Sequence, residues 1–321
     1  MTLEIAEVAA LSRSIIQEVE KAVVGKRAAL EKIMAAFLST GGHVLLEDYP
    51  GLAKTLIANS FATALGMTFK RIQFTPDLLP GDITGGYIYD RTQNQFVLRK
   101  GSIFANIILA DEINRASPKT QSAMLEAMQE YQVTLEGETI PLPEPFIAIA
   151  TQNPIEYEGT FPLPEAQLDR FMIKLSIGYP SREDERLILQ SRQERKKDRL
   201  DLQSVTDNAG LLAMQSAVEQ VFIDKDLELY IVDLVQETRK HKKIALGSSP
   251  RGALALLKLG RAWAAMHERS YVLPDDIKHF VQPVLSHRII LDPDLWNSRV
   301  ANENILAEIV NTVPVPVIQN I

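Results

Sequence analysis

The sequence predicts an α/β domain built on a mostly parallel sheet, followed by a second domain that is mostly helical. Five short apolar runs of strand length, separated by segments with helical spacing, indicate a sheet that is covered on both faces. These runs are 43–47, 69–74, 103–110, 146–151 and 171–177. After Pro180 the patterns are helical, so the sheet is expected to end there. A chain of 321 residues has room for about two domains.

Helices are expected between and after the strands. Apolar residues recur at near-helical spacing from Leu3 onward, and Gly41-Gly42 ends the second helix before the first strand. The predicted helical segments are 3–20, 26–39, 55–65, 119–131, 182–201, 227–241 and 251–269, with another that begins at Pro274. Two insertions, 76–100 and 132–140, carry β-like flanks around turn residues and are predicted to be hairpins. We therefore divide the chain into an α/β domain (1–182), a charged helical connector (183–217) and a helical domain (218–321).

Composition excludes several classes of protein. A net charge of −7 and a pI near 5.4 argue against a protein whose main surface binds nucleic acid. The absence of cysteine excludes disulfides, thiol nucleophiles and cysteine-based metal sites, and the five histidines lack the spacing of a metal site. No apolar run approaches the length of about 18 residues that a membrane helix needs, and glutamates interrupt the apolar stretches near the N-terminus. We expect a soluble, cytoplasmic protein without membrane insertion.

The strongest local signal follows the first predicted strand. There the chain runs through a loop and then opens a helix with Lys54-Thr55. In a phosphate-binding loop, backbone N–H groups hold the phosphates, the lysine neutralises them and the hydroxyl binds Mg²⁺. The strict pattern G-x-x-x-x-G-K-S/T fails, because Asp48 and Ala53 stand at its glycine positions. An ordinary helix start is the alternative.

Two further strand ends carry polar residues that suit the same chemistry. Asp111 and Glu112 close the third apolar run, where Asp111 would hold Mg²⁺ and Glu112 would activate water. Asn153 closes the fourth run and could hydrogen-bond a γ-phosphate or the attacking water. The alternatives are a strand that ends in exposed acids and an Asn-Pro sequence that only starts a turn.

Two arginines are candidates for completing the site. Arg170 precedes the last predicted strand, either as a structural ion-pair partner or as an arginine that projects into a neighbouring subunit's site. Arg251 stands in the first turn of a helix that Ser249 is suited to cap, where the helix dipole disfavours a cation. A bound phosphate would compensate for that conflict.

The order of these features resembles the MoxR family of AAA+ ATPases. The segments that carry the resemblance are 74–85, 109–116, 118–121, 150–155 and 161–171, with weaker likeness at 249–251 and 287–289. The resemblance implies an AAA+ nucleotide-binding core with a helical lid. It also implies roles: Lys54 and Thr55 are the Walker A pair, Asp111 and Glu112 are Walker B, and Asn153 is sensor 1. Arg170 is implied to be the trans arginine finger, and Arg251 the sensor 2 residue that the lid supplies across the cleft.

The site that the resemblance implies has three parts. The catalytic set is Glu112, Lys54, Asn153, Arg170 and Arg251. The ligands of Mg²⁺ are Thr55 and Asp111. The residues that hold ATP are Val24, Gly25, Asp48, Tyr49, Pro50, Gly51, Leu52, Ala53, Lys54, Thr55, Leu56, Asp111, Asn153 and Arg251, with Val24-Gly25 at the adenine.

The implied function is ATP binding and hydrolysis by a chaperone-like assembly or remodelling factor for protein complexes. The implied partners are other copies of the chain in a ring, expected to be a hexamer, and a protein with a von Willebrand factor A domain. The alternatives are a nucleotide-gated binding module with little hydrolysis and a DNA-dependent motor, against which the acidic Glu136-Gly137-Glu138 turn argues. Two residues depart from the family pattern: Asp48, where glycine is expected, and Tyr131, where arginine is common. An Asp48 carboxylate that points inward would oppose phosphate, and the alternative is that it points away because it stands at a strand exit. We expect Asp48→Gly to tighten nucleotide binding.

Overall fold

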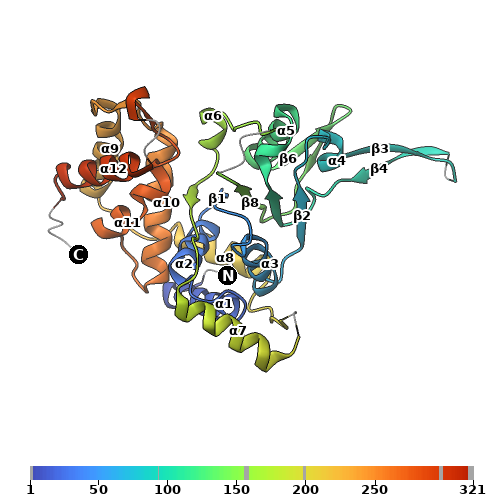
Figure 1. The fold of residues 1–321 in the computed structure, drawn as a ribbon, viewed down its shortest axis with the longest axis horizontal. Helices are drawn as coiled ribbons and strands as arrows, with labels where there is room; N and C mark the ends of the chain where they lie inside the picture. The colour runs from blue at the N-terminus through green and yellow to red at the C-terminus, as the bar shows by residue number, and fades with distance from the viewer. Residues whose placement is uncertain (1–2, 93, 155–158, 198–199, 296–298, 317–321) are drawn as a thin grey trace.

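Five parallel strands form the central sheet of the computed structural model, in the order β2-β5-β8-β1-β9 (Figure 1). The strands are β1 (Val44–Glu47), β2 (Phe69–Gln73), β5 (Ile107–Asp111), β8 (Ile147–Gln152) and β9 (Ile173–Leu175). Each of the five predicted apolar runs overlaps one of them, so the predicted α/β fold is confirmed. The structure describes residues 3–92, 94–154, 159–197, 200–295 and 299–316. Ile155 and the last residues of the predicted helical domain, 317–321, lie outside this part of the chain.

Helices cover both faces of the sheet. Successive side chains of a strand point to opposite faces, so the apolar side chains on each face need helices to bury them. Val44 and Leu109 are buried on the face covered by the first three helices, and Leu45 and Ile108 are buried on the other. The helices that contribute to these two cores include α1 (Ile5–Glu20), α2 (Arg27–Leu38), α3 (Lys54–Ala64) and α5 (Pro118–Glu130). Burial on both faces explains why the central strands read as continuous apolar runs rather than as alternating ones.

Two hairpins lie within the insertions at 76–100 and 132–140. Their strands are β3 (Gly85–Asp90), β4 (Gln95–Lys100), β6 (Gln132–Leu135) and β7 (Glu138–Pro141), and a short helix α4 (Pro80–Thr84) precedes the first hairpin. Positive φ angles at Glu136 and Gly137 fit the two-residue turn between β6 and β7. The β3–β4 hairpin projects from the body of the molecule (Figure 1). Its Tyr87 hydroxyl donates a hydrogen bond to the Glu138 carboxylate, which joins the two hairpins.

The C-terminal part is a helical domain beside the sheet domain (Figure 1). Its helices are α9 (Lys225–Lys240), α10 (Pro250–Met266), α11 (Pro274–Leu285) and α12 (Arg299–Thr312). A small antiparallel pair, β10 (Ile244–Leu246) and β11 (Ile290–Leu291), was not expected from the sequence. These strands are too short to produce a recognisable run. None of the described helices is both long enough and apolar enough to cross a membrane.

The segment between the two domains divides into two different helices. α7 (Arg182–Arg195) begins at a capping Ser181 and has no buried residue, as a charged helix on the surface should. α8 (Asn208–Val218) instead buries Leu211 and Met214 and packs against α1 and α2. Gln215 Nε2 donates to the carbonyl oxygen of Phe37 at 2.8 Å, which fixes α8 to the end of α2. The C-terminal part of the predicted connector, which α8 occupies, thus packs into the core.

Candidate functional site

The loop between β1 and α3 lies at the edge where the carboxyl ends of the parallel strands meet. Tyr49, Pro50, Gly51 and Leu52 belong to the loop, and Lys54, Thr55 and Leu56 lie in the first turn of α3. Ala53 adopts a left-handed backbone with φ 56°, which glycine adopts with less strain and which explains the glycine of the strict pattern. Lys54 Nζ donates to the carbonyl oxygens of Asp48 at 2.5 Å and Tyr49 at 3.2 Å. The lysine ammonium is therefore held at the loop itself.

Asp48 anchors the start of this loop to the segment that follows β9. Its side chain is nearly buried, and the carboxylate accepts hydrogen bonds from Ser176 Oγ (2.8 Å) and from the backbone N–H groups of Ile177 and Gly178. These donors compensate the negative charge. The Asp48 carboxylate therefore points toward the residues after β9. It does not point into the loop, where it would oppose phosphate.

Asp111 lies at the end of β5, and both of its carboxylate oxygens have partners. Thr151 Oγ1 donates to Oδ1 at 2.6 Å, while Arg71 on β2 donates to Oδ2 from Nε at 2.9 Å and from Nη2 at 2.6 Å. Mg²⁺ prefers oxygen ligands and is usually held by one or two carboxylates together with water and phosphates. Asp111 and the Thr55 hydroxyl have the chemistry to hold this ion, although Arg71 competes with it for Oδ2.

Glu112 follows directly and has a left-handed backbone with φ 56° and ψ 50°. Its Oε2 accepts hydrogen bonds from Gln73 Nε2 at 2.8 Å and Arg115 Nη1 at 2.9 Å, and its N–H donates to Thr151 Oγ1 at 2.8 Å. The carboxylate proposed to activate water is therefore held by an amide from β2 and by a nearby arginine. Sequence reasoning missed the Gln73 partner, because the pairing of β2 with β5 cannot be derived from strand order along the chain.

Asn153 lies between the two carboxylates and the phosphate-binding loop. It follows β8, the strand between β5 and β1, and its side chain is nearly buried. The N–H of Asp48 donates to the carbonyl oxygen of Gln152 at 3.2 Å, which holds the end of β8 against the loop. The structure therefore brings the loop, Asp111, Glu112 and Asn153 to one edge of the sheet.

A cavity of about 810 Å³ lies between α3, α7 and the end of α1, and its lining includes Val24 and Leu56. Gly25 adjoins this region in a left-handed conformation with φ 72°. A Cβ at Gly25 would lie 2.2 Å from Asp184 Cγ, so a larger residue here would displace the Asp184 side chain at the start of α7. The loop that was expected to contact adenine is therefore packed closely against α7.

Arg170 lies at the opposite edge of the sheet, where the strands begin. It precedes β9, and the N–H of Met172 donates to the carbonyl oxygen of His43, just before β1, at 2.8 Å. Because β1 and β9 run parallel, a strand of four residues, or about 13 Å, separates this edge from the phosphate-binding loop. Arg170 cannot reach the loop of its own chain along this path.

Arg251 lies beside Arg170 and not across the cleft from the loop, which corrects its expected position. Arg251 Nη1 is 3.6 Å from Asp169 Oδ2, and Ser249 Oγ donates to the same oxygen at 3.0 Å. These contacts dock the start of α10 at the edge where the strands begin. Arg170 and Arg251 line one cavity of about 220 Å³ together with Lys258.

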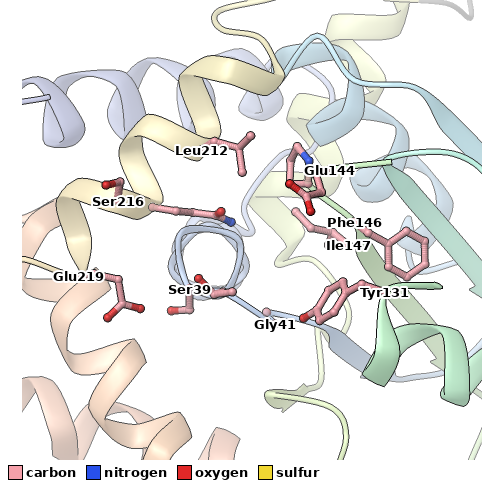
Figure 2. A pocket seen from close by; sticks show the side chains of 13 residues that line it. Ser39, Gly41, Tyr131, Glu144, Phe146, Ile147, Leu212, Ser216 and Glu219 are labelled. Atoms are coloured by element: carbon pink, nitrogen blue, oxygen red, sulfur yellow. The ribbon is translucent and has the colours of Figure 1, made fainter. Parts of the chain in front are cut away.

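A second cavity, of about 340 Å³, is shown in Figure 2. It adjoins the cavity lined by Arg170 and Arg251, because Thr40 and Gly41 line both. Tyr131 lines both cavities, and its hydroxyl points toward Gly41, where a Cβ would lie 3.2 Å from it. Burial raises the pKa of Tyr131. Leu212 and Ser216 of α8 form the opposite wall. This cavity was not expected from the sequence, because α8 was not expected to pack here.

Known proteins similar to this chain include a chaperone and an ATPase candidate. The family model of the "ATPase family associated with various cellular activities (AAA)" matches residues 43–173, and the AAA lid domain model matches residues 236–309. The chain is 42% identical to Chaperone MoxR1 of Mycobacterium tuberculosis, over 97% of this chain and 84% of that protein. It is 48% identical to the uncharacterised protein YeaC of Bacillus subtilis, over 94% of each. The crystal structure of a candidate ATPase from Cytophaga hutchinsonii matches with a TM-score of 0.89 and 39% identity, covering 98% of this chain and 97% of that one.

Proposed function

This chain belongs to the MoxR family of AAA+ ATPases, and we propose that it binds ATP with Mg²⁺ and hydrolyses the ATP. The observation that carries the proposal is the position of the Lys54 loop, Asp111 and Glu112 at one edge of the sheet. In the proposed site Lys54 neutralises the β- and γ-phosphates, while Thr55 and Asp111 hold the metal ion. Glu112 orients and deprotonates the attacking water, and Asn153 hydrogen-bonds the γ-phosphate or that water.

We further propose that Arg170 and Arg251 act on ATP held by a neighbouring subunit. Both arginines lie at the edge where the strands begin, together with Lys258, while the phosphate-binding loop lies at the other edge. A cluster of cations on one edge and a phosphate site on the other suits head-to-tail association, which gives a ring when the rotation between subunits closes. The ring is expected to be a hexamer. Each complete site then combines a loop from one subunit with arginines from the next.

Phosphate release measured over a range of protein concentrations tests this proposal. Specific activity is expected to rise with concentration, because each site needs a second subunit. Mixing Arg170→Ala subunits, which keep the loop, with Glu112→Gln subunits, which keep the arginine, should restore turnover that neither variant shows alone. Specific activity that is independent of concentration, with no recovery in the mixture, would reject the trans arrangement.

The same ATPase is proposed to act as a chaperone-like assembly or remodelling factor in the cytoplasm, in line with the name of its relative Chaperone MoxR1. The β3–β4 hairpin supports a client-binding role, because Ile88, Tyr89 and Phe96 are exposed on it. A protein with a von Willebrand factor A domain is the proposed partner. Addition of a protein with such a domain is expected to change ATP turnover. Unchanged turnover and no detectable binding would reject that partner.

One observation favours the alternative of a nucleotide-gated binding module with little hydrolysis. Asp111 and Glu112 are both engaged by arginines, Arg71 and Arg115. A site that stays in this arrangement would bind nucleotide without activating water. ATP binding without phosphate release at concentrations where rings form would support the alternative over the leading proposal.

A further inference from the structure

The segment that carries Arg170 is held by a buried arginine of the helical domain. Residues 169–172 join α6 (Glu165–Leu168) to β9. Arg288, just beyond α11, has a side chain that is 3% exposed and lies against this segment. Its Nε donates to Asp169 Oδ1 at 2.9 Å, so the buried guanidinium is paired with a carboxylate. Burial lowers the pKa of Arg288 to about 10, so the side chain remains charged at neutral pH.

The same guanidinium bonds backbone on both sides of Arg170. Arg288 Nη2 donates to the carbonyl oxygens of Asp169 at 3.3 Å and Phe171 at 2.6 Å, and Nη1 donates to that of Met172 at 3.1 Å. His287 adds a contact from Nε2 to the Phe171 carbonyl oxygen at 3.0 Å. A planar group with several fixed donors constrains orientation as well as distance. The backbone direction at residue 170 is thereby set from the helical domain.

Asp169 extends this network to the second arginine of the edge. Its Oδ2 accepts from Ser249 Oγ at 3.0 Å and lies 3.6 Å from Arg251 Nη1, while Oδ1 receives Arg288. Arg170 itself leaves Nε buried and without a hydrogen-bond partner in the part of the chain that the structure describes. Arg170 also lines a cavity beside Arg251, so its side chain borders open space at this edge while its backbone is clamped.

We propose that Arg288 is a positioning residue for Arg170: it clamps residues 169–172 so that Arg170 points into the site of the neighbouring subunit. This inference rests on the proposed trans role of Arg170. Arg288 needs no contact with nucleotide in this role. Its effect should be confined to the site that its own subunit completes, which is the neighbour's site.

Arg288→Met tests the inference, because methionine keeps an apolar stem and removes the donors. The homomeric variant is expected to bind ATP like the wild type but to lose about 100-fold in turnover, the scale of a misplacement of about 1 Å. Mixed with an equal amount of Glu112→Gln, it should regain about a quarter of wild-type turnover, because one interface in four pairs an intact loop with an intact finger. A defect in the variant's own loop would show no such recovery.

The matched control is Arg261→Met. Arg261 of α10 pairs with Glu219, just after α8, at 3.1 Å and has a partly buried side chain, but none of its hydrogen bonds in the described chain goes to residues 169–172. This variant tests whether losing any ion pair between the helical domain and the sheet domain lowers turnover. Its turnover is expected to stay within about twofold of the wild type. Arg288→Lys covers the possibility that methionine at 288 prevents folding. It keeps the charge beside Asp169 but cannot span the three carbonyl groups, so it should also lose turnover and recover on mixing.

Three results would overturn the inference. The first is wild-type turnover by folded Arg288→Met rings. The second is a mixture with Glu112→Gln that stays inactive for both Arg288 variants, although the Arg170→Ala mixture recovers; this would refute the role of Arg288 alone. The third is failure of the Arg170→Ala mixture itself, which would refute the trans role of Arg170 and the present inference with it.

Discussion

Arg71 and Asp111 form an ion pair between the neighbouring strands β2 and β5, with Arg71 Nη2 2.6 Å from Asp111 Oδ2. The Arg71 guanidinium thus occupies an oxygen of the carboxylate that is proposed to hold Mg²⁺, and it competes with the ion. Arg71→Met should therefore tighten Mg²⁺ binding by the nucleotide complex about fivefold, which corresponds to roughly 1 kcal/mol for a half-exposed cation. Titration of Mg²⁺ against a fluorescent nucleotide measures this change. Lys70→Met, on the same exposed edge strand, is the control, and equal Mg²⁺ affinity in Arg71→Met and wild type would contradict the prediction.

Glu112→Gln should bind ATP with nearly wild-type affinity and lose turnover by about 100-fold or more, because the amide cannot accept a proton from water. Glutamine can still accept hydrogen bonds from Gln73 and Arg115, so the local structure should persist. Calorimetry with ATP and a phosphate-release assay separate binding from chemistry. Turnover that is unchanged in the variant would remove Glu112 from its assigned role.

Asp48→Gly should weaken nucleotide binding and lower stability, opposite to the expectation from the sequence alone. The substitution removes the acceptor for Ser176 Oγ and for the backbone N–H groups of Ile177 and Gly178. Leaving such buried donors without a partner costs about 1–3 kcal/mol. Urea unfolding and ATP calorimetry check both effects, with Asp48→Asn as an intermediate case that keeps one carbonyl acceptor. Tighter ATP binding by the glycine variant would restore the inward-pointing interpretation.

His43 should make stability depend on pH in acid. Its ring is buried, with Nδ1 accepting from the Ala148 N–H at 3.0 Å and Nε2 3.0 Å from the Met128 carbonyl oxygen, which selects the neutral form. Burial lowers the pKa of His43 from 6.5 to about 4. The unfolded chain therefore binds a proton more readily, and stability falls as the pH drops from 6.5 toward 4. The loss at pH 4 is about 3 kcal/mol relative to pH 7.

The comparison for His43 is His43→Gln, which offers a donor and an acceptor but does not titrate. Its free energy of unfolding should lack this contribution, so the wild-type advantage over the variant should shrink by about 3 kcal/mol between pH 7 and pH 4. Chemical unfolding at several pH values gives both curves. Parallel curves would show that His43 is not the residue responsible.

Much of the fold was predictable because strands that are buried on both faces consist of short, continuous apolar runs, which can be recognised in the sequence. The runs at 103–110 and 146–151 are apolar because both faces of β5 and β8 are covered, and the polar residues that end them fall at one edge because parallel strands end together. Asp111, Glu112 and Asn153 could therefore be proposed as candidate site residues from sequence spacing alone. The structure accounts for the Ala53 departure, since one left-handed residue that is not glycine is tolerated at moderate cost.

Other features depend on contacts between distant segments, which leave no local pattern. The position of Arg251 is set by Asp169 and Ser249, 80 residues apart, and nothing near Arg251 in sequence records that contact. The same holds for Arg71, which meets Asp111 only because β2 lies beside β5. The orientation of Asp48 depends on donors at residues 176–178. The residue type at a motif position thus predicted which chemistry the side chain could perform. It did not predict where the side chain points or which residues it contacts.

The apolar core continues from the sheet domain into the helical domain without a boundary. Ile15 and Ile33, from α1 and α2, belong to the same buried cluster as Leu256 and Leu259 of α10, which packs on both helices. Swinging the helical domain away from the sheet would expose this surface to water at about 25 cal/mol per Å². The two domains of one subunit should therefore move together as a rigid body during ATP turnover. Relative motion is then expected between neighbouring subunits of the proposed ring rather than at a hinge between the two domains.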